Sequence, residues 1–98
     1  MMQVVYNASV NTVSKHHYIY VLECADETLY CGYTTDVERR VAEHNGRGKV
    51  AGARYTSGRR PVKVIYQETF SSRSDALKRE AEIKKLSKQQ KLALVHLQ

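Results

Sequence analysis

Hydrophobic residues along the chain follow two spacings, which together predict an α+β domain. Apolar and aromatic residues with strand-like alternation occupy residues 18–24, 28–34 and 62–70. Helical spacing follows the second strand, up to Gly46, and then covers residues 72–86 and 88–95. The order ββαβαα predicts a small three-stranded antiparallel sheet with flanking helices.

Capping residues predict where each helix begins. These are Thr35 with Glu38 (a capping box), Ser72, and Ser87 with Gln90 (a second capping box). Gly46 is expected to end the first helix, because glycine readily adopts the left-handed conformation that follows a last turn.

The chain divides into an extension and one domain. Residues 1–15 are polar and lack a sustained period, so we expect an N-terminal extension ahead of a domain at residues 16–98. No apolar run approaches the roughly 20 residues of a membrane helix, and the first residues lack a secretory pattern. Cys24 and Cys31 fit neither a disulfide framework nor zinc-ligand spacing. A reduced, cytoplasmic protein without a membrane partner is expected.

Positive charge is concentrated in one segment. The 98 residues include 16 Lys and Arg against 10 Asp and Glu, giving a net charge of +6, which suggests a polyanionic partner. Residues 45–60 contain five cations, four glycines and no acid. We expect a mobile arm that follows a nucleic-acid backbone; a solvated loop is the alternative. The expected nucleic-acid contacts are Lys49, Arg54, Tyr55 (stacking on an unpaired base), Arg59, Arg60 and, from a later helix, Lys84.

The first helix places polar residues beside its apolar face. At 100° per residue, Arg40 and His44 fall next to the valines that must face the core, and are expected at its rim. Arg39 and Glu43 are expected to face solvent. The two adjacent arginines are therefore not equivalent.

A later helix places a carboxylate inside its apolar arc. Glu80 and Lys84 lie in the middle of an arc that includes Leu77 and Ala81. An i, i+4 ion pair is common on exposed helices, but a carboxylate within an apolar stripe needs a cation, a metal or a wet cleft.

These residues together resemble the GIY-YIG nuclease superfamily. Its two short strand motifs are matched by Tyr18-Ile19-Tyr20 and Tyr30-Cys31-Gly32, and its helical arginine and histidine by Arg40 and His44. Glu80 matches the late glutamate. The chain is similar to small stand-alone bacterial members and, more distantly, to endonucleases that cut branched DNA. Tyr18 and Cys31 replace the usual glycine and isoleucine, and no asparagine is placed after the glutamate helix.

The resemblance implies a metal-dependent endonuclease. The implied catalytic residues are Tyr20, Tyr30, Arg40, His44 and Glu80. Glu80 would hold Mg²⁺, or Mn²⁺ in its place, and Arg40 would stabilise charge on the phosphate. Tyr30 and His44 would position the water and the phosphate. Whether Tyr20 acts as the base or orients a metal-bound hydroxide stays open.

The resemblance favours DNA recognised by its structure rather than its sequence, with a protein partner as a source of specificity. RNA and linear DNA stay open as substrates. One alternative is a nucleic-acid-binding module of the same fold that has lost useful catalysis. Another is a structural protein of the ribosome periphery, which would need the cations but not Glu80.

Overall fold

The computed structural model describes residues 16–48 and 50–97, so the expected extension at residues 1–15 lies outside them. The strands are β1 (His17–Glu23), β2 (Leu29–Thr34) and β3 (Lys63–Phe70). The helices are α1 (Val37–His44), α2 (Arg54–Ser57), α3 (Arg73–Lys84) and α4 (Lys88–His96). The predicted α+β fold and ββαβαα order are confirmed, with α2 as an added short helix. No helix in the described ranges is long and apolar enough to cross a membrane.

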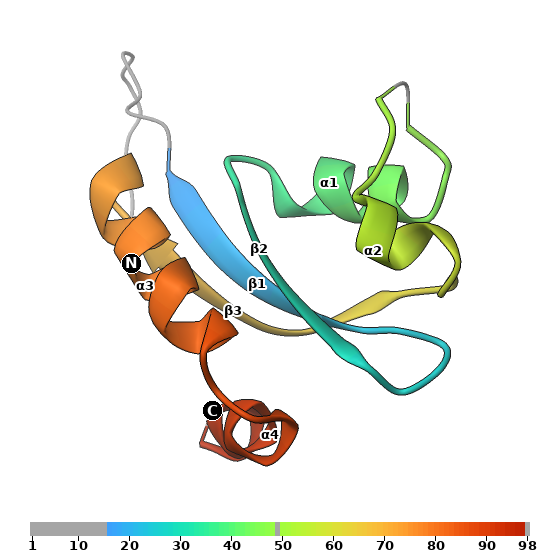
Figure 1. Ribbon diagram of the computed structural model, residues 1–98. Coiled ribbons are helices and arrows are strands. Elements are labelled where there is room, and N and C mark those ends of the chain that lie inside the picture. Colours follow the sequence, from blue (N-terminus) through green and yellow to red (C-terminus); the bar gives the residue numbers. More distant parts are fainter. Residues whose placement is uncertain (1–15, 49, 98) are drawn as a thin grey trace.

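The sheet has the strand order β2-β1-β3, and both pairings are antiparallel. Its central strand, β1, pairs with β2 through a hairpin in which Tyr20 lies opposite Gly32. The pairing of β1 with β3 has a register shift between Val21 and Leu22. Figure 1 shows the sheet with α1 and α2 on one side and α3 on the other.

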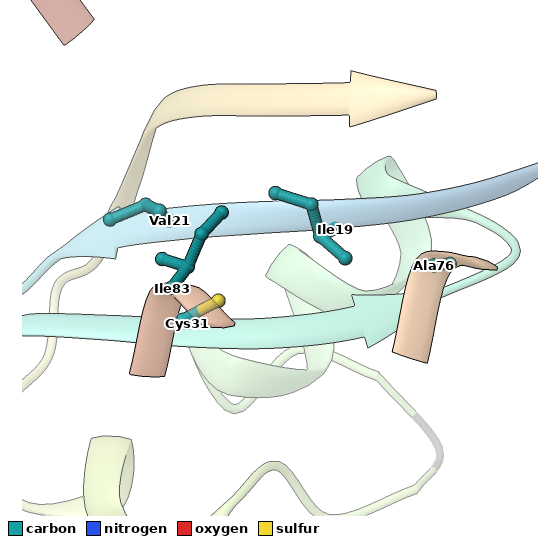
Figure 2. Close-up of a cluster of buried hydrophobic side chains, with 5 residues drawn as sticks. All are labelled: Ile19, Val21, Cys31, Ala76 and Ile83. Atoms are coloured by element: carbon teal, nitrogen blue, oxygen red, sulfur yellow. The ribbon is translucent and has the colours of Figure 1, made fainter. Parts of the chain in front are cut away.

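One face of the sheet is a dry apolar core. Successive strand residues point to opposite faces, so Ile19 and Val21 share a face that excludes Tyr20. There they pack with Cys31 of β2 and with Ala76 and Ile83 of α3 (Figure 2). Leu94 of α4 adds a partly buried side chain to this cluster. α3 and α4 therefore serve to close this face.

The opposite face mixes apolar and polar groups. Leu22, Cys24 and Val62 are buried there together with Tyr20. Val41 of α1 packs against this cluster. We call this the α1 face, and the face beneath α3 the α3 face.

The helix caps agree with the sequence at two of three predicted starts. Ser72 accepts a hydrogen bond from the backbone of Asp75, and Ser87 and Gln90 form the predicted capping box. The predicted box at Thr35 and Glu38 is wrong by one residue. Asp36 is the N-cap, because its carboxylate accepts from the Arg39 amide at 3.0 Å. Gly46 has φ +80°, as expected beyond the helix end.

Candidate active site

Tyr20 crosses the neighbouring strand at a glycine. An ideal Cβ on Gly32 would lie 2.4 Å from the Tyr20 hydroxyl oxygen, closer than real Cβ contacts. Only glycine leaves room for the ring at this position, as expected for a strand glycine approached by another group. The Tyr20 side chain is 1% exposed and is therefore held in one place on the α1 face.

His44 lies at the centre of the site. Its Nε2 is 2.8 Å from the Tyr20 hydroxyl, and its Nδ1 is 2.7 Å from the Thr56 hydroxyl. The expected place at the rim is wrong, because His44 is 0% exposed. The chain beyond α1 folds back over the end of that helix and covers the imidazole. Burial, and next the charge of Arg40, lowers the pKa of His44 to about 4, so the ring is neutral at pH 7.

Arg40 points toward the same place and is held by a carboxylate. Its Nη1 lies 2.8 Å from Glu43 Oε1 and donates to the carbonyl of Ala51 at 3.2 Å. Burial opposes its charge, but interactions with Glu43 and the Tyr20 hydroxyl outweigh this and raise the pKa of Arg40. Arg39 is more exposed, with 55% of its side chain accessible against 25% for Arg40. The predicted difference between the two arginines is confirmed.

The prediction that Glu43 faces solvent is wrong. Glu43 is 6% exposed and accepts ion pairs from Arg40 at 2.8 Å and Arg39 at 3.6 Å. A Cβ on Gly52 would lie 2.8 Å from the Glu43 carbonyl oxygen, which shows how closely the following loop covers this helix. The prediction came from a helical projection, which considers one helix alone and cannot show that a later loop covers this side of it.

Tyr30 completes an aromatic group around His44. The centroids of the Tyr30 and His44 rings are 5.3 Å apart in an edge-on arrangement, and that of Tyr55 is 5.5 Å from Tyr30. The Arg59 guanidinium lies 4.1 Å from the Tyr55 centroid. Tyr55 thus contacts both Tyr30 and Arg59 and is 37% exposed, and its stacking on an unpaired base stays a prediction.

The hydroxyl of Tyr20 is a poor acid in this setting. Burial raises its pKa above the ordinary value of 10, and the neighbouring Tyr30 raises it further. Arg40 acts in the opposite direction but does not reverse the shift. Tyr20 is therefore a neutral phenol at pH 7.

Glu80 comes from a different helix than Arg40 and His44. It belongs to α3, whose Ala76 and Ile83 pack on the other face of the sheet. Its Oε2 lies 3.2 Å from Lys84 Nζ, and its side chain is 17% exposed. The negative charge of Glu80 also raises the pKa of Tyr20, by less than burial or Tyr30 does. The apolar arc is narrower than expected, because Ala81 and Lys84 are exposed.

A metal ion near Glu80 would find few protein ligands. Within residues 16–48 and 50–97, no three His, Cys, Asp or Glu side chains gather as a metal-binding group. Zinc needs such a set, whereas Mg²⁺ is commonly held by one or two carboxylates with water and substrate phosphate. A single, partly exposed carboxylate fits the latter arrangement.

The basic segment forms part of the site wall, which differs from the expected free arm. Arg59 Nε pairs with Asp26 Oδ2 at 3.0 Å, and Arg60 Nε donates to the carbonyl of His44 at 2.7 Å. Arg54 is exposed on α2. Lys49 lies outside the described residues. The segment thus folds back to anchor α2 against α1.

Thr56 and Glu43 were missed by the sequence predictions. Thr56 is 0% exposed and binds the imidazole of His44. No periodicity points to a threonine in a short helix inside a glycine-rich segment. Thr56 lies among the cations of residues 45–60, but that position does not indicate what its side chain does.

Comparison with known proteins identifies relatives over most of the chain. A UPF0213 protein of Staphylococcus haemolyticus is 57% identical over 79 residues, covering 81% of this chain and 93% of the relative. A UPF0213 protein of Natronomonas pharaonis is 60% identical over 79 residues, covering 81% and 89%. These names give no activity.

Solved structures of similar proteins agree with the fold. The solution structure of a UPF0213 protein from Bacillus halodurans has a TM-score of 0.54 at 44% identity, covering 85% of each chain. A solution structure of an E. faecalis protein has a TM-score of 0.56 at 48% identity, covering 86% of this chain and 90% of the other.

A family model extends these comparisons to the site. It matches residues 16–93 and is described as the GIY-YIG catalytic domain. The matched range includes all five residues that the resemblance implied, as well as Thr56. The chain therefore belongs to the GIY-YIG catalytic domain family, a family of nuclease-type domains.

Proposed function

We propose that this protein is a metal-dependent endonuclease that hydrolyses phosphodiester bonds, with DNA as the expected substrate and Mg²⁺ as the expected ion. One observation carries the proposal. Tyr20 and His44 are joined by a buried 2.8 Å hydrogen bond, with Tyr30 and Arg40 beside them. Burying a tyrosine–histidine pair next to an arginine has an energetic cost that a purely structural sheet face does not require.

Arg40 is suited to bind the scissile phosphate. Its raised pKa keeps it positively charged at any physiological pH. Its ion pair with buried Glu43 fixes the guanidinium before substrate arrives. A preorganised cation stabilises the charge that develops on phosphate oxygens in the transition state.

Tyr20 is proposed to receive the proton of the attacking water while its own proton passes to His44 Nε2. The water O–H bond breaks as the new phosphorus–oxygen bond forms, and the phenol stays neutral. The bond from phosphorus to the leaving oxygen breaks in the same step, and the leaving oxygen takes its proton from solvent. Forming a phenolate at pH 7 would cost more than about 4 kcal/mol, because the pKa of Tyr20 lies above 10. Protonating His44 costs about 4 kcal/mol from a pKa of about 4. A nearby phosphate anion opposes the phenolate and favours the imidazolium.

Glu80 is proposed to hold the magnesium ion, with water and substrate phosphate as its other ligands. Bound there, the ion would neutralise charge on the phosphate and lower the pKa of a bound water. The ion pair of Glu80 with Lys84 would open so that Lys84 could turn to the nucleic acid. Because Lys84 is half exposed, this rearrangement needs no change in the core.

A nucleic-acid-binding module without useful catalysis is the second candidate. It is favoured by the ion pair of Glu80 with Lys84, which occupies the carboxylate that a metal ion would need. Such a module would keep its affinity for DNA but would not cleave it.

Incubation with labelled branched and linear DNA and RNA, in Mg²⁺, Mn²⁺ or EDTA, tests both candidates. Cleavage that needs a divalent ion and favours branched DNA is expected. Binding without cleavage in every metal would leave the binding module as the better account.

Replacing Glu80 tests the metal assignment. We expect Glu80→Gln to abolish turnover while DNA affinity stays within a few-fold. Glu82→Gln is the matched control, because Glu82 lies on the same helix, is exposed and pairs with Arg79 at 3.1 Å. Equal cleavage rates for the Glu80 variant and wild type would remove Glu80 from the metal site.

A further inference from the structure

We propose that Thr56 is a positioning residue that holds His44 in the tautomer with its proton on Nδ1. Nε2 is then left with a lone pair that faces the Tyr20 hydroxyl. The inference deepens the proposed nuclease function, since the proton path through Tyr20 needs an acceptor at Nε2. The tautomer itself can be measured without any cleavage assay.

Three buried groups form a continuous hydrogen-bonded chain. Tyr20 Oη lies 2.8 Å from His44 Nε2, and His44 Nδ1 lies 2.7 Å from Thr56 Oγ1. Thr56 Oγ1 in turn lies 3.0 Å from the carbonyl oxygen of Ala53. The side chains of Tyr20, His44 and Thr56 are 1%, 0% and 0% exposed, so water does not compete for these positions.

The carbonyl of Ala53, the last group in this series of hydrogen bonds, determines which atom donates in each of the others. A carbonyl oxygen can only accept, and in the proposed arrangement the single hydroxyl proton of Thr56 goes to the carbonyl oxygen of Ala53 rather than to His44 Nδ1. The Ala53 amide, 3.5 Å from Nδ1, is the longer and competing contact at that nitrogen. Thr56 Oγ1 must then accept from His44, which places the imidazole proton on Nδ1. In the neutral ring Nε2 carries no proton, so it accepts the hydroxyl proton of Tyr20. The Tyr20 oxygen then keeps its lone pairs for donors other than His44, of which Arg40 is one.

Thr56 is held at this place by the backbone around it. The Arg59 amide donates to the Thr56 carbonyl at 3.0 Å, and Arg60 Nε donates to the His44 carbonyl at 2.7 Å. A Cβ on Gly52 would lie 2.7 Å from the His44 Cα, so glycine permits the loop to approach α1 this closely. The short helix α2 thus fixes Thr56 against the imidazole.

The charged groups around His44 favour a neutral ring. Arg40 of α1 and Arg60 of the loop lower its pKa, while Glu43 of α1 raises it. Tyr20 of β1 and Tyr30 of β2 also face the ring. A neutral imidazole carries its proton on one of its two nitrogens, and in this proposal the hydrogen bond to Thr56 places it on Nδ1.

The competing interpretation is that Thr56 only fills space and satisfies its own hydroxyl. In that case Thr56→Val, which keeps the shape, would leave the His44 tautomer unchanged. ¹⁵N NMR of the imidazole nitrogens distinguishes the two cases, because protonated and unprotonated ring nitrogens have different shifts. We expect Nδ1–H in the wild-type protein and in Thr56→Ser. We expect a shift toward Nε2–H in Thr56→Val, where Nδ1 has lost its acceptor.

Nε2–H in the wild-type protein, or Nδ1–H in a folded Thr56→Val variant, would overturn the proposal. Either spectrum can be interpreted whether or not the protein cleaves DNA. If Thr56→Val does not fold, the wild-type and serine spectra still decide the tautomer.

The cleavage assay provides a second readout. For Thr56→Val we expect kcat to fall by about 10- to 100-fold with little change in KM, by analogy with the loss of hydrogen-bond partners of metal-binding histidines. The pH profile of kcat should also change, because the acceptor nitrogen is lost. Thr56→Ser should restore both. A serine variant as slow as the valine variant would show that packing, rather than the hydroxyl, is what matters.

Discussion

The two faces of the sheet bury side chains of different kinds. Beneath α3, the buried residues are apolar or small, with Ile19, Val21 and Ile83 at the centre. Beneath α1, apolar residues share the interior with a hydrogen-bonded line of polar groups that runs through His44. Apolar contacts stabilise a fold without needing exact geometry, whereas buried polar groups cost free energy unless every partner is present. The α3 face is therefore suited to stability and the α1 face to chemistry.

One pair of substitutions separates the two faces most sharply. Tyr20→Phe keeps the packing on the α1 face but removes the hydroxyl, so we expect cleavage to fall by about 10² to 10⁴-fold. Ile83→Ala should lower the free energy of unfolding by about 2–5 kcal/mol while kcat of the folded protein stays unchanged. Cleavage kinetics and urea unfolding of both variants provide the measurement. A similar loss of kcat in both variants would mean that the faces are not functionally distinct.

The two adjacent arginines test the division within α1 itself. Arg40→Ala should cost about 10²-fold in cleavage rate, because it removes the cation proposed to bind the phosphate. Arg39→Ala is the control, since Arg39 is the more exposed partner of Glu43 and should change the rate little. Thermal melts of both variants show whether the loss of Arg40 also leaves Glu43 inadequately paired. Equal rates for the two variants would contradict the assignment of Arg40.

The stability of the α1 face should depend on pH through His44. Its pKa is about 4 in the folded protein against about 6.5 when unfolded, so between these values the unfolded chain binds more protons. Stability should therefore fall as the pH is lowered from about 6.5 to 4, by about 3 kcal/mol in total. Urea unfolding at several pH values measures the slope. His44→Asn should show a flatter dependence in this window, and an unchanged slope would assign the effect to other groups.

The smallest expected effect concerns the cations of residues 45–60. Arg54 is exposed, and replacing it with Gln should flatten the slope of log affinity against log salt by about 0.9 on duplex DNA. Arg59→Gln should change the slope less, because Arg59 is already paired with Asp26. DNA titrations at several salt concentrations test this, with Lys78→Gln on α3 as the control. A larger change from Lys78 would place the DNA on the α3 face.

The helices and strands of both faces could be predicted from the sequence, but only some of the side-chain contacts on the α1 face could. The resemblance to the GIY-YIG superfamily implied that Tyr20, Tyr30, Arg40 and His44 would meet, together with Glu80. The burial of Glu43 could not be anticipated, because it depends on a later loop that Gly52 allows to approach the helix.

The remaining differences have similar physical reasons. Thr35 and Asp36 compete for the same cap, and the pattern does not show which side chain reaches the third amide. The contact of Thr56 with His44 is set by how α2 packs on α1, and neither segment encodes that packing alone. Glu80 lies within a partly buried stripe as predicted, and its pairing with Lys84 at 3.2 Å is the i, i+4 ion pair that the helical spacing allowed.

The central position of β1 has a consequence for how the molecule folds. β2 follows β1 after a short turn, so the hairpin closes with a small loss of chain entropy, whereas β3 joins only after α1 and α2 have been enclosed in a long loop. Tyr20 and Tyr30 belong to the early hairpin, while His44 and Thr56 belong to the enclosed loop. We therefore expect the bond between Tyr20 and His44 to form late in folding. Amide protons of α2 should exchange with solvent sooner than those of β1.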